Sequence, residues 1–264
     1  MVEFHQLAAA IYLAAGIGAL LGIVLPAPRM VRGAAWGLVL GAIVHAVGFA
    51  TLHRLDPPPP LTGLPVSVSL MAWMGVLSLL VLMWRARIAG LTAVVGPVAF
   101  LAVFAAALRL PHPSEPTLSG AGQWPHAHIV LASAGLALLS IAALAGGFFL
   151  VEYRRLKSKR HLGAARVRLP SLEALDRVNA TALATGFPLL TLGVLTGMMW
   201  LQGASGNYWR TASHETWTLI AWAIYAGLVA ARFAGHQGAR QAAASALAGF
   251  FFLVFAVVGV GLLV

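Results

Sequence analysis

Long runs of apolar residues without charge recur along the whole chain of 264 residues, and they constrain its fold more than any other feature. Each run is near the ~20 residues that an α-helix needs to cross the hydrocarbon core of a bilayer. Backbone amides in lipid must be paired within the chain, and the alternating pattern of a membrane β-barrel is missing, so the runs predict helices. We therefore expect an all-α, polytopic membrane helix bundle in which residues 1–264 form a single integral membrane domain.

The apolar runs predict about eight transmembrane helices. Their approximate ranges are His5–Pro26, Ala34–His53, Val66–Trp84, Ala89–Leu110, Ala127–Tyr153, Val178–Gln202, Glu215–Arg232 and Gln241–Val264. Pro97 and Pro188 lie inside two of these ranges, where proline is expected to kink a helix. The sequence LPSLEALDRVN at residues 169–179 is expected to form a short surface helix that leads into the sixth span.

The distribution of charge predicts how the helices are oriented. The net charge of +10 is typical of a nucleic-acid-binding protein, but the basic residues lie in short loops between apolar runs, so we expect no nucleic acid partner. The loops between the spans alternate between the two sides of the membrane. The loops on one side carry only Arg54, Arg109 and Arg210 out of 17 Lys and Arg residues. The side whose loops carry more Lys and Arg is expected to face the cytoplasm. This arrangement places both termini and residues 208–214 outside a bacterial cytoplasmic (inner) membrane. The basic segment Arg154–Arg168 is expected to anchor on membrane lipid.

A polar, aromatic segment at residues 203–232 runs directly into the seventh predicted helix and carries most of the reactive side chains of the chain. At 100° per residue, His214, Trp217, Ala221 and Tyr225 share one face of this helix. That face presents an imidazole above an aromatic wall, which suits a flat apolar ligand with a metal centre. The alternative is an ordinary belt of Trp and Tyr at the membrane interface, with His214 in contact with lipid headgroups.

Histidine is the leading candidate metal ligand, because the chain has 9 His and 0 Cys, and Met is only a weaker option. The predicted topology places His128 and His214 at the outer face, each near the start of a helix, and we assign these two as metal ligands. His126 and His53 are reserve ligands. His45 lies inside the second span, so it is either a second site within the membrane or a neutral ring bonded to a neighbouring helix.

The stretch YWRTASHETWTLIAWAIYAGLVAAR at residues 208–232 resembles the tryptophan-rich haem-handling signature of the cytochrome c assembly protein family. The stretches LPSLEALDRVNATALATGFPLLTLGVLTGMMW, HIVLASAGLALLSIAALAGGFFLVEYRRLKSKR and GHQGARQA are similar to the HemX-like and CcsA-like branch of that family. The sequence departs from the signature at residues 211–213, where Thr-Ala-Ser replaces Trp-Asp-Pro, and at His214, which replaces lysine.

The resemblance implies a polytopic membrane protein that binds or presents haem, with the aromatic loop on the outer side. The positions that match the family signature are Tyr208, Trp209, Glu215, Trp217, Trp222 and Tyr225, and His128 and His45 match histidines of the family. The resemblance implies that all of these except Glu215 bind the cofactor. The implied cofactor is non-covalent, b-type haem. The implied partners are another membrane protein of cytochrome c assembly and apocytochrome c.

These observations predict a haem-handling protein of cytochrome c biogenesis that delivers or presents haem at the outer face of the membrane. We expect no enzymatic activity, because the sequence has no Ser/His/Asp arrangement, phosphate-binding glycine loop or HExxH motif. One alternative is a membrane regulator of haem biosynthesis that acts through the basic cytoplasmic loop. The other alternative is a haem-free permease for a small molecule.

Overall fold

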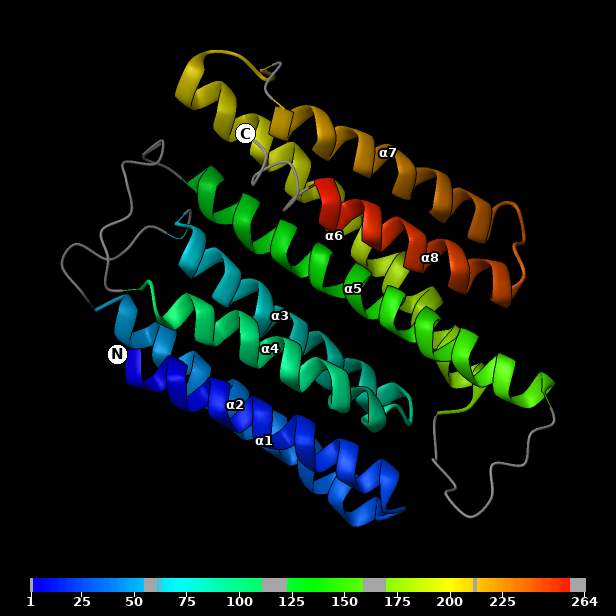
Figure 1. Cartoon of the computed structure of the whole chain (residues 1–264). Helices are drawn as coiled ribbons and strands as arrows, with labels where there is room; N and C mark the ends of the chain where they lie inside the picture. The colour runs from blue at the N-terminus through cyan, green and yellow to red at the C-terminus, as the bar shows by residue number, and fades with distance from the viewer. Residues whose placement is uncertain are drawn as a thin grey trace. The chain divides into compact units, whose positions relative to one another are not determined.

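The computed structural model describes residues 2–54, 61, 63–110, 123–158, 170–210 and 213–256, with the backbone alone at residues 213 and 214. This part of the chain holds eight α-helices and one short 3-10 helix (Figure 1). They are α1 (Val2–Val24), α2 (Pro28–Leu52), α3 (Leu64–Arg85), η1 (Ala89–Leu91), α4 (Thr92–Ala107), α5 (Gln123–Lys157), α6 (Leu172–Ser205), α7 (Ser213–Phe233) and α8 (Ala239–Val254). The prediction of an all-α polytopic helix bundle with about eight helices is confirmed.

Seven of the described helical segments are long and apolar enough to cross a membrane, and α8 adds a shorter apolar helix of 16 residues. The longest are α5 with 35 residues and α6 with 34 residues. At 1.5 Å per residue each is roughly 50 Å long, which exceeds the ~30 Å hydrocarbon core of a bilayer. The chain is therefore a multi-pass membrane protein, and the side that each loop faces stays a prediction.

Residues 172–179, expected as a short surface helix, instead form the first turns of α6 without a break. Leu175 and Val178 in these turns are buried. The side-chain amide of Asn179 donates a hydrogen bond of 2.8 Å to the carbonyl of Ala142 on α5. Burial of this face and the added hydrogen bond stabilise α6 beyond its apolar run.

The chain divides into two compact units, which we describe separately. Unit 1 comprises Met1–Thr117 and Lys159–Ser171, and unit 2 comprises Leu118–Ser158 and Leu172–Val264. Unit 1 thus contains α1 to α4, and unit 2 contains α5 to α8. That residues 1–264 act as a single membrane domain stays a prediction.

In unit 1, α1 packs against α2 and α4, and α3 packs against α4 and α2. Glycine permits the closest of these approaches. A Cβ atom on Gly96 of α4 would lie 2.6 Å from the carbonyl oxygen of Tyr12 on α1, and one on Gly41 of α2 would lie 2.6 Å from the Tyr12 ring. Tyr12 is therefore fixed at the centre of this unit by the backbones of two neighbouring helices.

In unit 2, α6 and α8 each pack against both α5 and α7. The helices α5 and α7 consequently lie across from each other, with α8 between them in Figure 1. The backbones of α5 and α6 approach closely: a Cβ atom on Gly135 would lie 2.6 Å from the backbone nitrogen of Leu190. Gly146 of α5 meets α8 in the same way, because a Cβ there would lie 2.6 Å from the carbonyl oxygen of Ala243.

Basic residues gather at one end of unit 2, where α5 and α7 end and α6 and α8 begin (Figure 1). This basic end carries Arg154, Arg155, Lys157, Arg177, Arg232 and Arg240. The opposite end, where α5 and α7 begin and α6 and α8 end, carries His126 and His128, and we call it the histidine end. The positive-inside rule predicts that the basic end faces the cytoplasm and the histidine end the outer side.

Candidate functional site

The imidazole of His128 is held against the backbone of α6 at the histidine end. Its Nδ1 atom lies 2.7 Å from the carbonyl oxygen of Gly193. A carbonyl oxygen can only accept, so we assign the hydrogen to Nδ1, which donates. In the neutral ring the lone pair then lies on Nε2, and this arrangement is the one that metal-binding histidines adopt when a backbone carbonyl orients them.

Two glycines of α6 make this contact possible. A Cβ atom on Gly197 would lie 2.7 Å from Nδ1 and 2.9 Å from Cε1 of His128. A Cβ atom on Gly193 would lie 2.9 Å from the backbone of Ala132, one turn further along α5. The imidazole therefore occupies a recess that any side chain at residue 197 would fill.

The indole of Trp200 lies beside His128. The two rings have their centroids 5.9 Å apart at an interplanar angle of 42°. The indole nitrogen Nε1 of Trp200 is buried and has no hydrogen-bond partner within the described ranges. The site thus combines an oriented imidazole, an aromatic wall and a buried hydrogen-bond donor.

Trp217, Ala221 and Tyr225 share one face of α7, as the sequence pattern predicts. This face packs against α8: the Trp217 ring lies 6.0 Å from the ring of Phe252 and 5.7 Å from that of Phe255. Tyr225 is 1% exposed. Its ring carbon Cζ would lie 3.6 Å from a Cβ atom added at Gly249. The part of the aromatic face around Tyr225, toward the basic end, is therefore covered by α8. The half-buried Trp217 is the residue of this face that lies nearest the histidine end.

Trp222 lies on another face of α7 and connects this helix to α6. Its Nε1 donates a hydrogen bond of 3.0 Å to Oγ1 of Thr191. Its ring stacks on Phe187, with centroids 5.9 Å apart at 27°. Trp222 thus fixes the register between α6 and α7.

The loop before α7 carries the two remaining aromatic positions of the signature. Tyr208 is 54% exposed and Trp209 is half-buried. The Arg210 guanidinium lies 3.6 Å from a carboxylate oxygen of Glu215 in the first turn of α7. This ion pair connects the loop to the start of the helix.

The contact between Trp222 and Thr191 shows which residues of α7 and α6 lie at the same level along the helix axes of unit 2. The positions of the other residues along these axes can be counted from that level. Trp217 lies roughly 8 Å from that level toward the histidine end, and the segment from Gly193 to Gly197 lies roughly 3–9 Å from it in the same direction. Because His128 contacts that segment, His128 and Trp217 lie at similar heights. They lie on α5 and α7, which are across from each other.

Three other histidines of the chain were predicted as ligands or reserve ligands. His214 lies in the first turn of α7, but its side chain is outside the described part. His126 is exposed on α5, and His53 is exposed at the C-terminal end of α2 in unit 1. The structure therefore fixes the surroundings of His128 but leaves its pairing with His214 a prediction.

His45 is fully buried in unit 1, and hydroxyl groups contact both of its ring nitrogens. Nδ1 lies 3.3 Å from the Tyr12 hydroxyl, and Nε2 lies 2.8 Å from Oγ of Ser69. The ring stacks on Phe49 with centroids 4.9 Å apart, and the His5 ring meets its edge at 5.2 Å. A metal at His45 would have to displace one of these hydroxyls, so the role of His45 in a second haem site stays a prediction.

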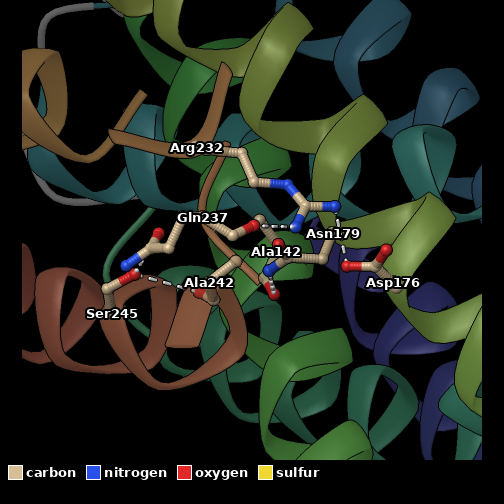
Figure 2. Close-up of polar contacts among 7 residues, drawn as sticks. All are labelled: Ala142, Asp176, Asn179, Arg232, Gln237, Ala242 and Ser245. Atoms are coloured by element: carbon tan, nitrogen blue, oxygen red, sulfur yellow. Dashed lines mark hydrogen bonds and ion pairs between the residues drawn. The ribbon is translucent and has the colours of Figure 1, made fainter. Parts of the chain in front are cut away.

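The basic end of unit 2 is closed by a polar cluster that the sequence reasoning missed (Figure 2). Arg232 at the end of α7 donates to Asp176 on α6 at 2.8 Å and to the carbonyl of Gln237 at 3.1 Å. The Arg232 side chain is only 13% exposed. This cluster fixes the turn between α7 and α8 to the start of α6, at the end of the unit opposite His128.

Sequence reasoning also missed Trp200, Gly193 and Gly197 at the histidine end. A signal for the two glycines is present, because they lie four residues apart in the GVLTG segment and so share one face of α6. Trp200 lies one turn further along the same helix. The side chain that this face meets could be read only from the pairing of α6 with α5.

The fold and the site define a multi-pass helical membrane protein in which an oriented histidine and an aromatic helix lie at one end of a four-helix unit. The chain belongs to the cytochrome c assembly protein family, because the sequence model of that family matches residues 61–264. It is 30% identical over 236 residues to the cytochrome c biogenesis protein CcsA of Prochlorococcus marinus strain NATL2A, an alignment that covers 77% of this chain and 74% of the relative.

A second relative, the cytochrome c biogenesis protein CcsA of Guillardia theta, is 26% identical over 224 residues, which cover 77% of this chain and 74% of the relative. A shorter alignment with CcsA of Picosynechococcus sp. strain ATCC 27264 / PCC 7002 / PR-6 reaches 41% identity over 92 residues, or 34% of this chain and 27% of the relative. The family resemblance seen in the sequence is confirmed by these findings.

Proposed function

We propose that this protein holds non-covalent b-type haem at the outer face of the bacterial inner membrane and presents it during cytochrome c biogenesis. The observation that carries the proposal is the hydrogen bond of 2.7 Å from His128 Nδ1 to the Gly193 carbonyl. With the hydrogen on Nδ1, the lone pair of the neutral ring is on Nε2, the nitrogen that could bind iron. A role in cytochrome c biogenesis agrees with the family to which the chain belongs.

The residues at the histidine end fit a haem group. Haem supplies an iron that accepts imidazole ligands and a flat apolar face that packs on aromatic rings. His128 offers the ligand, and Trp200 lies beside it with centroids 5.9 Å apart. The buried Nε1 of Trp200 is a donor suited to a polar group of the ligand.

The start of α7 supplies the opposite half of the proposed site. His214 is the proposed second ligand, and it lies one turn before Trp217 on the helix that faces α5 across unit 2. Cofactor sites in helix bundles are commonly built from side chains on such facing helices. Tyr208 and Trp209 in the preceding loop would shield the site from water, while Trp222 and Tyr225 hold α7 against α6 and α8.

The proposed partners follow from the same placement. Haem held at the end of unit 2 is accessible to another protein, and the exposed Tyr208 marks the loop that such a partner would meet. We propose apocytochrome c and a further membrane protein of cytochrome c assembly as these partners, with lipid around the helices. The chain acts as a holder of haem and performs no covalent chemistry in this proposal.

The test compares His128→Ala with the matched control His126→Ala. Both residues lie in the first two turns of α5, but His126 is exposed while His128 contacts α6. We expect the purified His128→Ala chain to lose most of its haem or its low-spin Soret spectrum, and His126→Ala to keep both. His214→Ala should behave like His128→Ala.

The proposal is wrong if His128→Ala and His214→Ala both keep full haem content and an unchanged low-spin spectrum. Extraction of haem into acidified acetone tests the non-covalent attachment separately, because covalently bound haem stays with the protein. Haem staining of mature cytochrome c in cells that carry each variant measures the biological role.

A further inference from the structure

We infer that the backbone of α6, through the Gly193 carbonyl and the missing side chain at Gly197, decides which nitrogen of His128 binds iron. This inference rests on the proposed function and goes beyond it, because it assigns positioning roles to two residues that do not touch the ligand. Neither glycine carries a group that could bind haem itself.

His128 donates the hydrogen bond that joins it to α6. The 2.7 Å contact with Gly193 is short for a nitrogen–oxygen pair, and the carbonyl cannot donate. The hydrogen is therefore on Nδ1, and a neutral ring carries its lone pair on Nε2. A hydrogen bond of this kind orients the ring and increases its basicity as a ligand.

The space that the His128 ring occupies depends on the absence of a side chain at Gly197. A Cβ atom at residue 197 would lie 2.7 Å from Nδ1, the same atom that donates to Gly193. The obstructed group is a side chain, which can rotate, so Gly197→Ala should turn the ring away from α6 and leave the helices in place. Gly193→Ala is a poorer probe, because its Cβ would lie 2.9 Å from backbone atoms of Ala132 and would force the helices apart.

The carbonyl of Gly193 is itself held in place by a neighbouring side chain. The Thr196 hydroxyl donates to it at 3.0 Å and also bonds the carbonyl of Leu192 at 2.8 Å. The carbonyl is thus part of a fixed helix turn. His128 therefore receives its orientation from a rigid element, as a site that must hold a ligand precisely requires.

The main experiment compares Gly197→Ala with Gly203→Ala in the purified full chain loaded with haem. Gly203 lies on the same helix and has nothing within 4 Å of an added Cβ. Removal of an orienting partner of a metal ligand lowers affinity about 10–100-fold, and we expect a loss of this size for Gly197→Ala alone. The low-spin spectrum and the reduction potential should change with it, whereas Gly203→Ala should match the wild type.

Exogenous imidazole separates the positioning role from a general loss of structure. If Gly197→Ala only turns His128 away, added imidazole should occupy the open position and restore the low-spin spectrum, as it should in His128→Gly. A wild-type spectrum, affinity and potential in Gly197→Ala, alongside a defective His128→Gly, would overturn the inference and leave the proposed function intact. A wild-type His128→Gly would instead remove His128 from the proposed function.

A second measurement needs no glycine variant and applies even if Gly197→Ala fails to fold. Nitrogen-15 NMR of the haem-free chain, with the His128 signals identified by their loss in His128→Gln, reports which ring nitrogen carries the hydrogen. We expect the nitrogen-15 shifts to show a protonated Nδ1 and an unprotonated Nε2. A ring protonated on Nε2 alone would overturn the inference.

Discussion

The indole nitrogen of Trp222 donates a hydrogen bond of 3.0 Å to the Thr191 hydroxyl, and this bond connects the aromatic helix α7 to α6. Thr191 in turn donates to the carbonyl of Phe187, whose ring stacks on Trp222. The register of α7 against the helix that orients His128 is therefore set by three side chains. Along the helix axis, Thr191 lies roughly 3–9 Å and Phe187 roughly 9–15 Å from the segment that contacts His128, toward the basic end.

Thr191→Val should weaken this connection while keeping the shape of the side chain. The loss leaves the indole N–H of the half-buried Trp222 without this partner, and the expected cost is about 1 kcal/mol, the low end of the range for buried groups. We expect a lower unfolding temperature in detergent and easier proteolysis in the loop at residues 206–210. Thr185→Val is the control, since Thr185 is exposed and bonds only the carbonyl of Thr181 on its own helix; equal effects of the two changes would contradict the assignment.

Arg232→Ala should destabilise the basic end of unit 2. The ion pair with Asp176 is partly buried, with side chains 13% and 30% exposed. Its loss should therefore cost about 1–3 kcal/mol, between the values for exposed and fully buried pairs. A double-mutant cycle with Asp176→Asn measures the coupling.

The neighbouring pair of Arg177 and Glu173 serves as the control for this cycle. Both residues lie on the surface of α6, the helix that carries Asp176, and the side chains of Arg177 and Glu173 are 64% and 81% exposed. Arg177→Ala should change stability by less than about 0.5 kcal/mol, as is typical of exposed helix pairs. Comparable coupling energies for the two pairs would show that the burial of Arg232 contributes nothing.

Gly135→Ala should separate α5 from α6. Its Cβ would lie 2.6 Å from the backbone nitrogen of Leu190, and a backbone atom cannot rotate away. Overpacking of this kind costs about 1–3 kcal/mol, and we expect a lower unfolding temperature together with disturbance at His128. Gly227→Ala on α7, where an added Cβ meets nothing within 4 Å, should be neutral or slightly stabilising.

Ser69→Ala should destabilise unit 1 without loss of haem from the histidine end. It removes the partner of His45 Nε2, a buried nitrogen whose hydrogen bond is 2.8 Å long. The expected cost is about 1–3 kcal/mol in the free energy of unfolding. Ser67→Ala is the control, because the Ser67 hydroxyl bonds only carbonyls of its own helical turn and Gly63.

The haem content of His45→Ala tests the second predicted site directly. A fall in the haem-to-protein ratio, with the spectrum of the remaining haem unchanged, would support a haem at His45. An unchanged ratio would leave His45 as a structural histidine held by Tyr12 and Ser69.

Much of the fold could be predicted because lipid leaves the backbone so few options. The apolar runs located the eight α-helices of the described ranges, and the 100° periodicity placed Trp217, Ala221 and Tyr225 on one face of α7. The same pattern could not say that α8 covers this face, since that depends on which helices pair. The ends of α5 and α6 were misjudged because charged residues also favour helix, and burial of Leu175 extends α6 beyond its apolar run.

The site was predicted less completely for a related reason. His128 was recognised as a candidate ligand from residue type and position, but its orienting carbonyl belongs to Gly193, 65 residues away. Likewise, His45 was recognised as an ionisable residue inside a span, whereas Tyr12 and Ser69 lie 33 and 24 residues from it. Such partners become visible only when the helices are packed.

The close contact between α5 and α6 also constrains how the protein is made. During synthesis α5 leaves the ribosome before α6 and α8, the two helices that cover it. At ~5–20 residues per second, the 34 residues of α6 follow over roughly 2–7 s. Throughout that interval the surface of α5 at Gly135, which α6 later covers, faces lipid or the insertion machinery, and the imidazole of His128 lacks the Gly193 carbonyl that orients it. A nascent chain arrested before Leu172 would therefore present α5 without the helix that covers Gly135 and orients His128.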